Sequence, residues 1–268
     1  MAASRPPLIL LPPSEGKAPG GTGEPWRSGS TSFPALDEDR QLVIRRLGTA
    51  MRTSIAARSK LLGVKGIALA AATDANLRVP SAPTMPAIER YNGVLYAALD
   101  PSTLAPRLGE RMAGQVITFS AVWGLVSPTD AIPDYKLKMG ASLGRTGRLA
   151  SFWKPRIDSA LSPLTDRRTV WNLLPNDHDS AWSGAPTATS VITVRFLDDV
   201  DRAGTRQLIS VSHWNKLLKG ALVRHVLAHQ LTDPDGLTAF EHPQGYRYVP
   251  SLTTVDTNRI SVSLVSRR

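Results

Sequence analysis

The sequence predicts a mixed α/β (α+β) fold in a single domain covering residues 1–268. Short apolar segments typical of strands are scattered among longer segments whose apolar residues have helical spacing, and no repeat or linker divides the chain. Apolar residues make up 42% and charged residues 20% of the sequence, which is typical of a folded domain with a sizeable core. We therefore expect a mixed sheet with surrounding helices.

The N-terminal part of the chain predicts one strand followed by helices. Pro7–Leu11 is a short buried strand candidate that leads into a turn. Residues 18–32 are rich in Gly, Pro, Ser and Thr, which predicts a mobile loop. Apolar residues at helical spacing predict helices at Asp37–Lys60, Gly66–Ala72 and Ala87–Leu99.

The rest of the chain adds most of the strands. Apolar and β-branched runs predict strands at Val116–Phe119, Val170–Leu174, Val191–Phe196, Gln207–Val211, Tyr246–Val249 and Ile260–Val265. Leu149–Leu161 and Trp214–His229 have helical spacing, and the second of these is amphipathic.

Composition narrows the functional classes. The chain has no cysteine, which excludes disulfides, thiolate metal sites and a cysteine nucleophile. Its apolar runs are too short to cross a bilayer and no signal peptide is visible, so we expect a cytoplasmic protein without a membrane partner. His213, His225 and His229 are not spaced with carboxylates as a metal site requires, so no metal and no cofactor is predicted.

The charge balance favours a polyanionic partner. Lys and Arg total 32 against 22 Asp and Glu, giving a net charge of +10. Such a field attracts nucleic acid through phosphate contacts and counterion release. The alternative is compositional, because arginine exceeds lysine in an Ala-, Gly- and Pro-rich chain and the basic residues are spread along its whole length.

The most polar segment follows the strand candidate Val116–Phe119. Ser127–Leu143 combines prolines that stiffen the backbone with several ionisable side chains, namely Asp130, Asp134, Tyr135, Lys136 and Lys138. Polar groups held beside a strand end predict a binding or catalytic site. A solvated turn whose charges pair locally is the alternative.

Two glycine-containing turns are further candidates. Leu11–Lys17 places Glu15 and Lys17 just after the first strand, without the glycine spacing of a phosphate-binding P-loop. It could hold an anion or a carboxylate, or be an ordinary exit from a strand. Gly63, Lys65 and Gly66 join two predicted helices as in a helix-hairpin-helix turn, whose exposed backbone N–H groups favour phosphate. A helix C-cap explains Gly63 equally well.

Two helical segments also carry functional candidates. Thr84–Tyr96 could place an acid, a base and aromatic faces on a cleft, or form a capped helix with a Glu89–Arg90 pair. The basic residues Lys216, Lys219 and Arg224 lie on one arc of the segment Ser212–Arg224. They predict a phosphate-facing helix, and a solvated basic face has the same pattern.

These segments resemble the YaaA family of peroxide-stress proteins. The resemblance follows most of the chain in order, through Leu11–Lys17, Ala87–Leu99, Val122–Gly140, Ser151–Trp153, Asn172–Leu173, Ser212–Arg224 and Leu237–Tyr248. The run from Tyr135 to Gly140 is its most specific part. Family members more often carry Arg at position 136 and Glu at position 138, and the segment 175–178 also departs from the family pattern.

The resemblance implies a single-domain fold of the YaaA type, with a helix-hairpin-helix-like segment at residues 37–72 and a positively charged cleft. It also implies DNA binding, including duplex and structured forms, and protection from peroxide with lower free intracellular iron. The leading hypothesis is thus a DNA-binding protein of the oxidative-stress response. Its phosphate contacts would come from Gly63, Lys65, Gly66, Lys136, Lys216, Lys219 and Arg224.

The competing hypothesis is an enzyme that acts on a nucleotide, a nucleoside or a damaged base, in a role that could belong to a specialised pathway. A carboxylate held near lysines can act as a general base or stabilise an oxocarbenium-like centre during N-glycosidic cleavage. The groups assigned to this chemistry are Glu15, Lys17, Asp134, Tyr135 and Asp177. Direct iron sequestration is disfavoured, because the chain lacks cysteine and the paired Glu-x-x-His motifs of di-iron helices.

Overall fold

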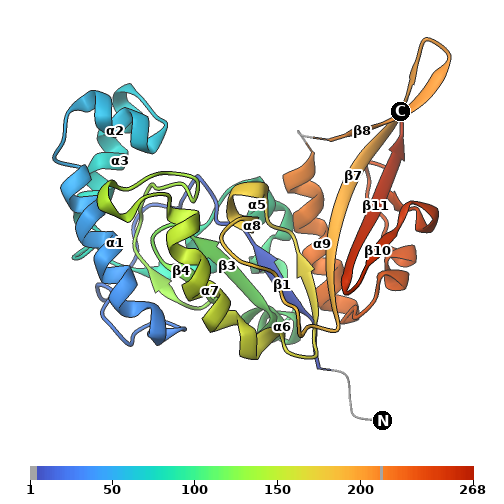
Figure 1. Ribbon diagram of the computed structural model, residues 1–268, viewed down its shortest axis with the longest axis horizontal. Helices are drawn as coiled ribbons and strands as arrows, with labels where there is room; N and C mark the ends of the chain where they lie inside the picture. Colours follow the sequence, from blue (N-terminus) through green and yellow to red (C-terminus); the bar gives the residue numbers. More distant parts are fainter. Residues whose placement is uncertain (1–4, 212–213) are drawn as a thin grey trace.

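In the computed structural model, which describes residues 5–211 and 214–268, a mostly parallel mixed sheet of nine strands runs through the molecule (Figure 1). Its order is β10-β11-β7-β6-β1-β3-β4, with β8 paired to β7 and β9 paired to β11. The strands are β1 (Leu8–Leu11), β3 (Val116–Ser120), β4 (Gly124–Val126), β6 (Thr169–Asn172), β7 (Ser190–Arg202), β8 (Thr205–Ser210), β9 (Arg247–Tyr248), β10 (Thr254–Asp256) and β11 (Arg259–Arg267). A separate antiparallel pair joins β2 (Met85–Pro86) to β5 (Ala131–Ile132). The predicted mixed α/β class is confirmed.

The helices pack around this sheet. They are α1 (Asp37–Ala50), α2 (Ile55–Leu62), α3 (Gly66–Arg78), α4 (Ala87–Arg90), α5 (Val94–Leu99), α6 (Pro106–Gln115), α7 (Leu149–Thr165), α8 (Asn176–Asp179) and α9 (Asn215–His229). Short 3-10 turns occur at Pro34–Leu36, Pro101–Thr103, Gly144–Thr146, Pro234–Ala239 and Pro250–Leu252. α2 and α3 project from one end of the molecule, opposite the end that carries β10 and β11 (Figure 1).

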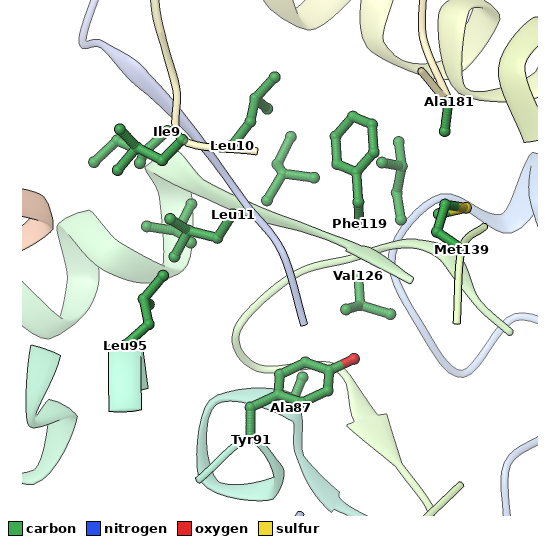
Figure 2. Close-up of a cluster of buried hydrophobic side chains, with 14 of the residues drawn as sticks. Ile9, Leu10, Leu11, Ala87, Tyr91, Leu95, Phe119, Val126, Met139 and Ala181 are labelled. Atoms are coloured by element: carbon green, nitrogen blue, oxygen red, sulfur yellow. The ribbon is translucent and has the colours of Figure 1, made fainter. Parts of the chain in front are cut away.

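The centre of the sheet is fully apolar. β1 is parallel to both of its neighbours, β3 and β6, and all four of its residues are buried. Figure 2 shows Leu10 and Phe119 on one side of these strands and Leu11 and Leu95 on the other. A strand covered on both faces needs a continuous apolar run, which is why Leu8–Leu11 could be identified from sequence. The parallel arrangement brings the carboxyl ends of β1, β3 and β6 to the same edge.

Two predicted helices are interrupted. The helix expected at Asp37–Lys60 ends at Ala50, and α2 begins after Ser54, whose side chain accepts a hydrogen bond from the Ala57 N–H. The helix expected at Ala87–Leu99 is divided by residues 91–93, where Tyr91 has extended backbone angles. The Ser54 N-cap competes with helix continuation at the first place, and at the second Tyr91 forms an isolated antiparallel bridge with Lys17. The apolar spacing alone did not reveal either break.

The other predicted elements are present with shifted ends, whereas the helices α6 and α8 and the short strands β2, β4, β5 and β10 were not predicted. Ser212 and His213, at the start of the predicted basic segment, lie outside the described residues. No helix in the described ranges is long and apolar enough to cross a membrane.

The loop at residues 18–32 has no regular helix or strand, as expected. Gly23 and Thr84 exchange two backbone hydrogen bonds across it. The buried guanidinium of Arg90 donates to the carbonyl oxygens of Ala18 and Gly20. Arg90 therefore holds this loop instead of forming the predicted pair with Glu89, which is exposed. The loop's mobility and the single-domain organisation stay predictions.

Candidate functional site

The turn after β1 and the polar segment after β4 meet near the carboxyl edge of the parallel strands. The Lys136 Nζ lies 3.1 Å from the Glu15 Oε2, and the Lys138 Nζ lies 3.7 Å from the Glu15 Oε1. Two lysines thus share one carboxylate that comes from a distant part of the chain. The Lys136 side chain is 19% exposed and that of Lys138 is 46% exposed, so both ammonium groups retain access to solvent.

Asn76 on α3 fixes the backbone of Lys136. Its amide nitrogen donates to the Lys136 carbonyl oxygen at 2.9 Å, and its amide oxygen accepts from the Lys136 N–H at 2.8 Å. Asn76 is 1% exposed. This residue was not singled out from sequence, although an asparagine among the alanines and leucines of α3 is an unusual polar group for a packed helix.

The charges around Glu15 keep it ionised. Partial burial by itself would raise its pKa, but the hydrogen bond and charge of Lys136 outweigh this effect, and the pKa lies below its usual value. The charges of Lys138 and Lys216 act in the same direction. Lys216 on α9 therefore belongs to the same electrostatic cluster as Glu15.

Lys17 occupies a more enclosed position. Its Nζ donates to the Ser14 carbonyl oxygen at 3.0 Å and lies 4.1 Å from the centre of the Tyr135 ring. Burial lowers the pKa of Lys17 to about 7. The charged groups that modify this effect are, in order, Asp134 (raising the pKa), Lys136 (lowering it), Glu15 (raising it) and Arg90 (lowering it).

A chain of buried hydroxyl groups lies behind Lys17. The Tyr135 Oη is 2.9 Å from the Tyr91 Oη and 2.8 Å from the Ser120 Oγ at the end of β3. Burial raises the pKa of Tyr135 to about 12 and also raises that of Tyr91, so both phenols are protonated at neutral pH. The Ser120 Oγ accepts from the backbone N–H groups of Val122 and Trp123. Tyr135 was predicted as a site residue, whereas Ser120 was missed because a serine inside an apolar strand carried no motif.

Asp134 is half-buried beside this network. Its negative charge raises the pKa of Lys17 and that of Arg90, so both cations are close enough to interact with it electrostatically. Within the described residues Asp134 forms no ion pair shorter than 4.0 Å. Its carboxylate is therefore available to a bound molecule.

Lys136, Lys138 and Lys216 around Glu15 are called the lysine cluster below. The α2–α3 hairpin lies next to this cluster. Gly63 ends α2 in a left-handed conformation, with φ of 69°, and Lys65 immediately precedes α3. A methyl group added at Gly63 would lie 3.3 Å from the Lys138 Nζ, so the Lys138 side chain passes beside this turn. A surface hollow at the hairpin is lined by Ala56, Ser59, Lys60, Gly63, Val64 and Lys65.

The basic residues of α9 separate into different environments. The Lys219 Nζ donates to the Leu173 carbonyl oxygen beyond β6, and burial lowers the pKa of Lys219 to about 8. The Arg224 guanidinium donates to the carbonyl oxygens of Leu99 and Asp100 and to the Thr103 hydroxyl. Arg224 thus anchors the end of α5, whereas Lys216 is exposed.

Asp177 on α8 is exposed and pairs with Arg148 at 3.3 Å. Its carboxylate also lies directly against Gly140, where a Cβ atom would come within 2.7 Å of the Asp177 Oδ2. No contact joins Asp177 to Lys17 or Glu15 among the described side chains. The structure therefore groups Glu15, Lys17 and Tyr135 with Lys136 but does not add Asp177 to them.

A second hollow, of about 490 Å³, lies over β6, β7, β10 and β11, away from the lysine cluster. Lys154, Asn172, Trp182 and Arg259 are among the residues that line it. None of the predicted site residues lines it. In the described residues, no group of three or more His, Asp or Glu side chains is arranged to hold a metal ion.

The fold and the site define a basic mixed α/β protein with lysines, a carboxylate and paired tyrosines at the carboxyl edge of its sheet. A family model described as peroxide stress protein YaaA matches residues 8–252, and the chain belongs to this family. The chain is 37% identical over 232 residues to a UPF0246 protein of Streptomyces coelicolor, covering 85% of each chain. It is 38% identical over 223 residues to a UPF0246 protein of Corynebacterium efficiens, covering 81% of this chain and 83% of the relative.

Proposed function

We propose that this peroxide-stress family member binds DNA, mainly through phosphate groups, along a surface that joins the α2–α3 hairpin to the lysine cluster. The observation that carries the proposal is the position of Lys138, which lies beside Gly63 and also contacts Glu15. The cations of the hairpin and of the cluster are thereby continuous along one surface, as a phosphate backbone requires.

The individual groups suit phosphate contacts. Lys65 and Lys216 are exposed, and Lys138 is partly exposed. The first turn of α3 presents free backbone N–H groups next to Lys65, where the helix dipole favours an anion. These contacts carry no base-specific information, so binding is expected to be largely independent of sequence.

A second candidate is chemistry on a nucleotide, a nucleoside or a damaged base. The observation that favours it is the enclosed Lys17, next to Asp134 and the tyrosine pair. A surface that only binds phosphate does not require a half-buried carboxylate, because its negative charge opposes the ligand. Asp134→Asn would be tested for loss of product from nucleosides and damaged oligonucleotides.

The DNA-binding proposal is tested with a fluorescent duplex titrated from about 50 to 200 mM salt. Log affinity should fall linearly with log salt, and a scrambled duplex should give the same slope. The double variant Lys65→Gln/Lys138→Gln should reduce the magnitude of the slope by about 2, since each lost phosphate contact contributes about 0.9.

Lys154→Gln is the matched control, because Lys154 is a partly exposed lysine of the second hollow. It should leave the slope unchanged. Absence of binding at low salt, or an equal effect of the control and the double variant, would contradict the proposed surface.

A further inference from the structure

The side chain of Lys17 has the surroundings of a nucleophilic amine. Its Nζ has one hydrogen-bond acceptor, the Ser14 carbonyl oxygen, and forms no ion pair with the described carboxylates. It lies against the face of Tyr135 and is enclosed enough that its pKa falls to about 7. Desolvation and neighbouring cations, here Lys136 and Arg90, are the conditions that activate a lysine toward carbonyl groups.

The amine is also connected to the surface on which DNA is proposed to lie. Glu15, which acts electrostatically on Lys17, contacts both Lys136 and Lys138. Lys138 in turn passes beside Gly63 in the hairpin. A DNA strand held along these lysines would therefore bring its sugars toward the turn that carries Lys17.

We propose that Lys17 forms an imine with the aldehyde of a ring-opened abasic deoxyribose in DNA, which would make this site a lyase for abasic DNA. The inference rests on the proposed DNA binding. An intact nucleotide offers no aldehyde, whereas an abasic sugar does, so the amine selects damaged strands by chemistry and not by base reading.

The step can be written with all atoms in place. The neutral Lys17 Nζ attacks C1′, and the resulting carbinolamine takes up a proton and loses water, which leaves a protonated imine. The imine acidifies C2′–H, and the Asp134 carboxylate accepts this proton. The C3′–O bond then breaks and the 3′ phosphate leaves. Water hydrolyses the conjugated imine, which releases an unsaturated aldehyde and restores the amine.

The test uses the full chain and a duplex with one abasic deoxyribose, in the presence of borohydride, which reduces the imine to a stable amine link. Wild type and the matched control Lys154→Gln should form a covalent protein–DNA adduct. Lys17→Gln and Lys17→Arg should form at least about tenfold less, because arginine keeps the charge but stays protonated. Mass spectrometry of the wild-type adduct should place the link on Lys17, independently of how the variants fold. Asp134→Asn should be trapped by borohydride but should not cut the strand.

Binding of an intact duplex, measured in parallel, separates the two proposals. Binding by wild type without any adduct would overturn the lyase and leave DNA binding in place. A link mapped to Lys219, the other lysine with a lowered pKa, would also overturn the assignment to Lys17. Loss of all binding to intact duplex would instead mark the failure of the proposed function.

Discussion

Replacing Asn76 by alanine should uncouple the α3 helix from the lysine cluster. The Asn76 amide makes both of its main-chain hydrogen bonds to Lys136, at 2.9 and 2.8 Å, and is 1% exposed. Alanine would leave the Lys136 N–H and carbonyl without these partners in a partly buried place. An unsatisfied buried polar group costs about 1–3 kcal/mol, so the free energy of unfolding should fall by about 3 kcal/mol.

Chemical unfolding followed by circular dichroism measures this change directly. For a chain of this length the melting temperature should fall by about 6–12 °C, at roughly 2–4 °C per kcal/mol. DNA affinity should fall as well, because the backbone that carries Lys136 and leads on to Lys138 would no longer be held against α3. The matched control is Asn176→Ala, whose exposed side chain forms no hydrogen bond among the described residues and should be nearly neutral.

A loss below about 1 kcal/mol, within the range of an ordinary single hydrogen bond, would refute the assignment of Asn76 as a clamp. A full loss of stability with unchanged DNA affinity would refute the link between the clamp and the binding surface. The two results are obtained separately, since stability is measured from the unfolding transition and affinity is measured on the folded protein without denaturant.

Two further predictions concern the charges of the site. Glu15→Gln should tighten DNA binding about threefold, because it frees Lys136 and Lys138 from their ion pairs with Glu15. Solvent-accessible ion pairs of this kind are worth about 0.2–1 kcal/mol each. Weaker binding in a fluorescence anisotropy titration would contradict this prediction. Lys17 should make stability rise with pH from about 7 toward the unfolded value of 10.5, because the unfolded chain then holds a proton that the folded chain lacks. The urea midpoint of the wild type, minus that of Lys17→Met, should rise over this pH range. A difference that does not change with pH would argue against a neutral Lys17.

Sequence patterns were sufficient to predict strands and helices where burial follows a local pattern, either a continuous apolar run or helical spacing. The four apolar residues of β1 predicted a buried strand, and the apolar spacing in α7 and α9 predicted helices. The helix break after Met51 was missed because a local turn and the Ser54 N-cap compete with the helical hydrogen bonds. The break at Tyr91 was missed because Tyr91 forms a bridge with Lys17, which is distant in sequence. The family resemblance was confirmed by the match over residues 8–252.

By itself, the sequence determined the mixed α/β class, the family, the central strand and the polar turn that carries Glu15 and Lys17. Only the tertiary structure decided which of these groups meet. Glu15 contacts Lys136 across 121 residues of sequence, and Asn76 contacts it across 60. Arg224, which has the same sequence pattern as Lys216, is instead bound to the end of α5. Local periodicity specifies which side of an element is buried, whereas the partner of a charged side chain depends on how distant elements pack, and that information is not contained in any single segment.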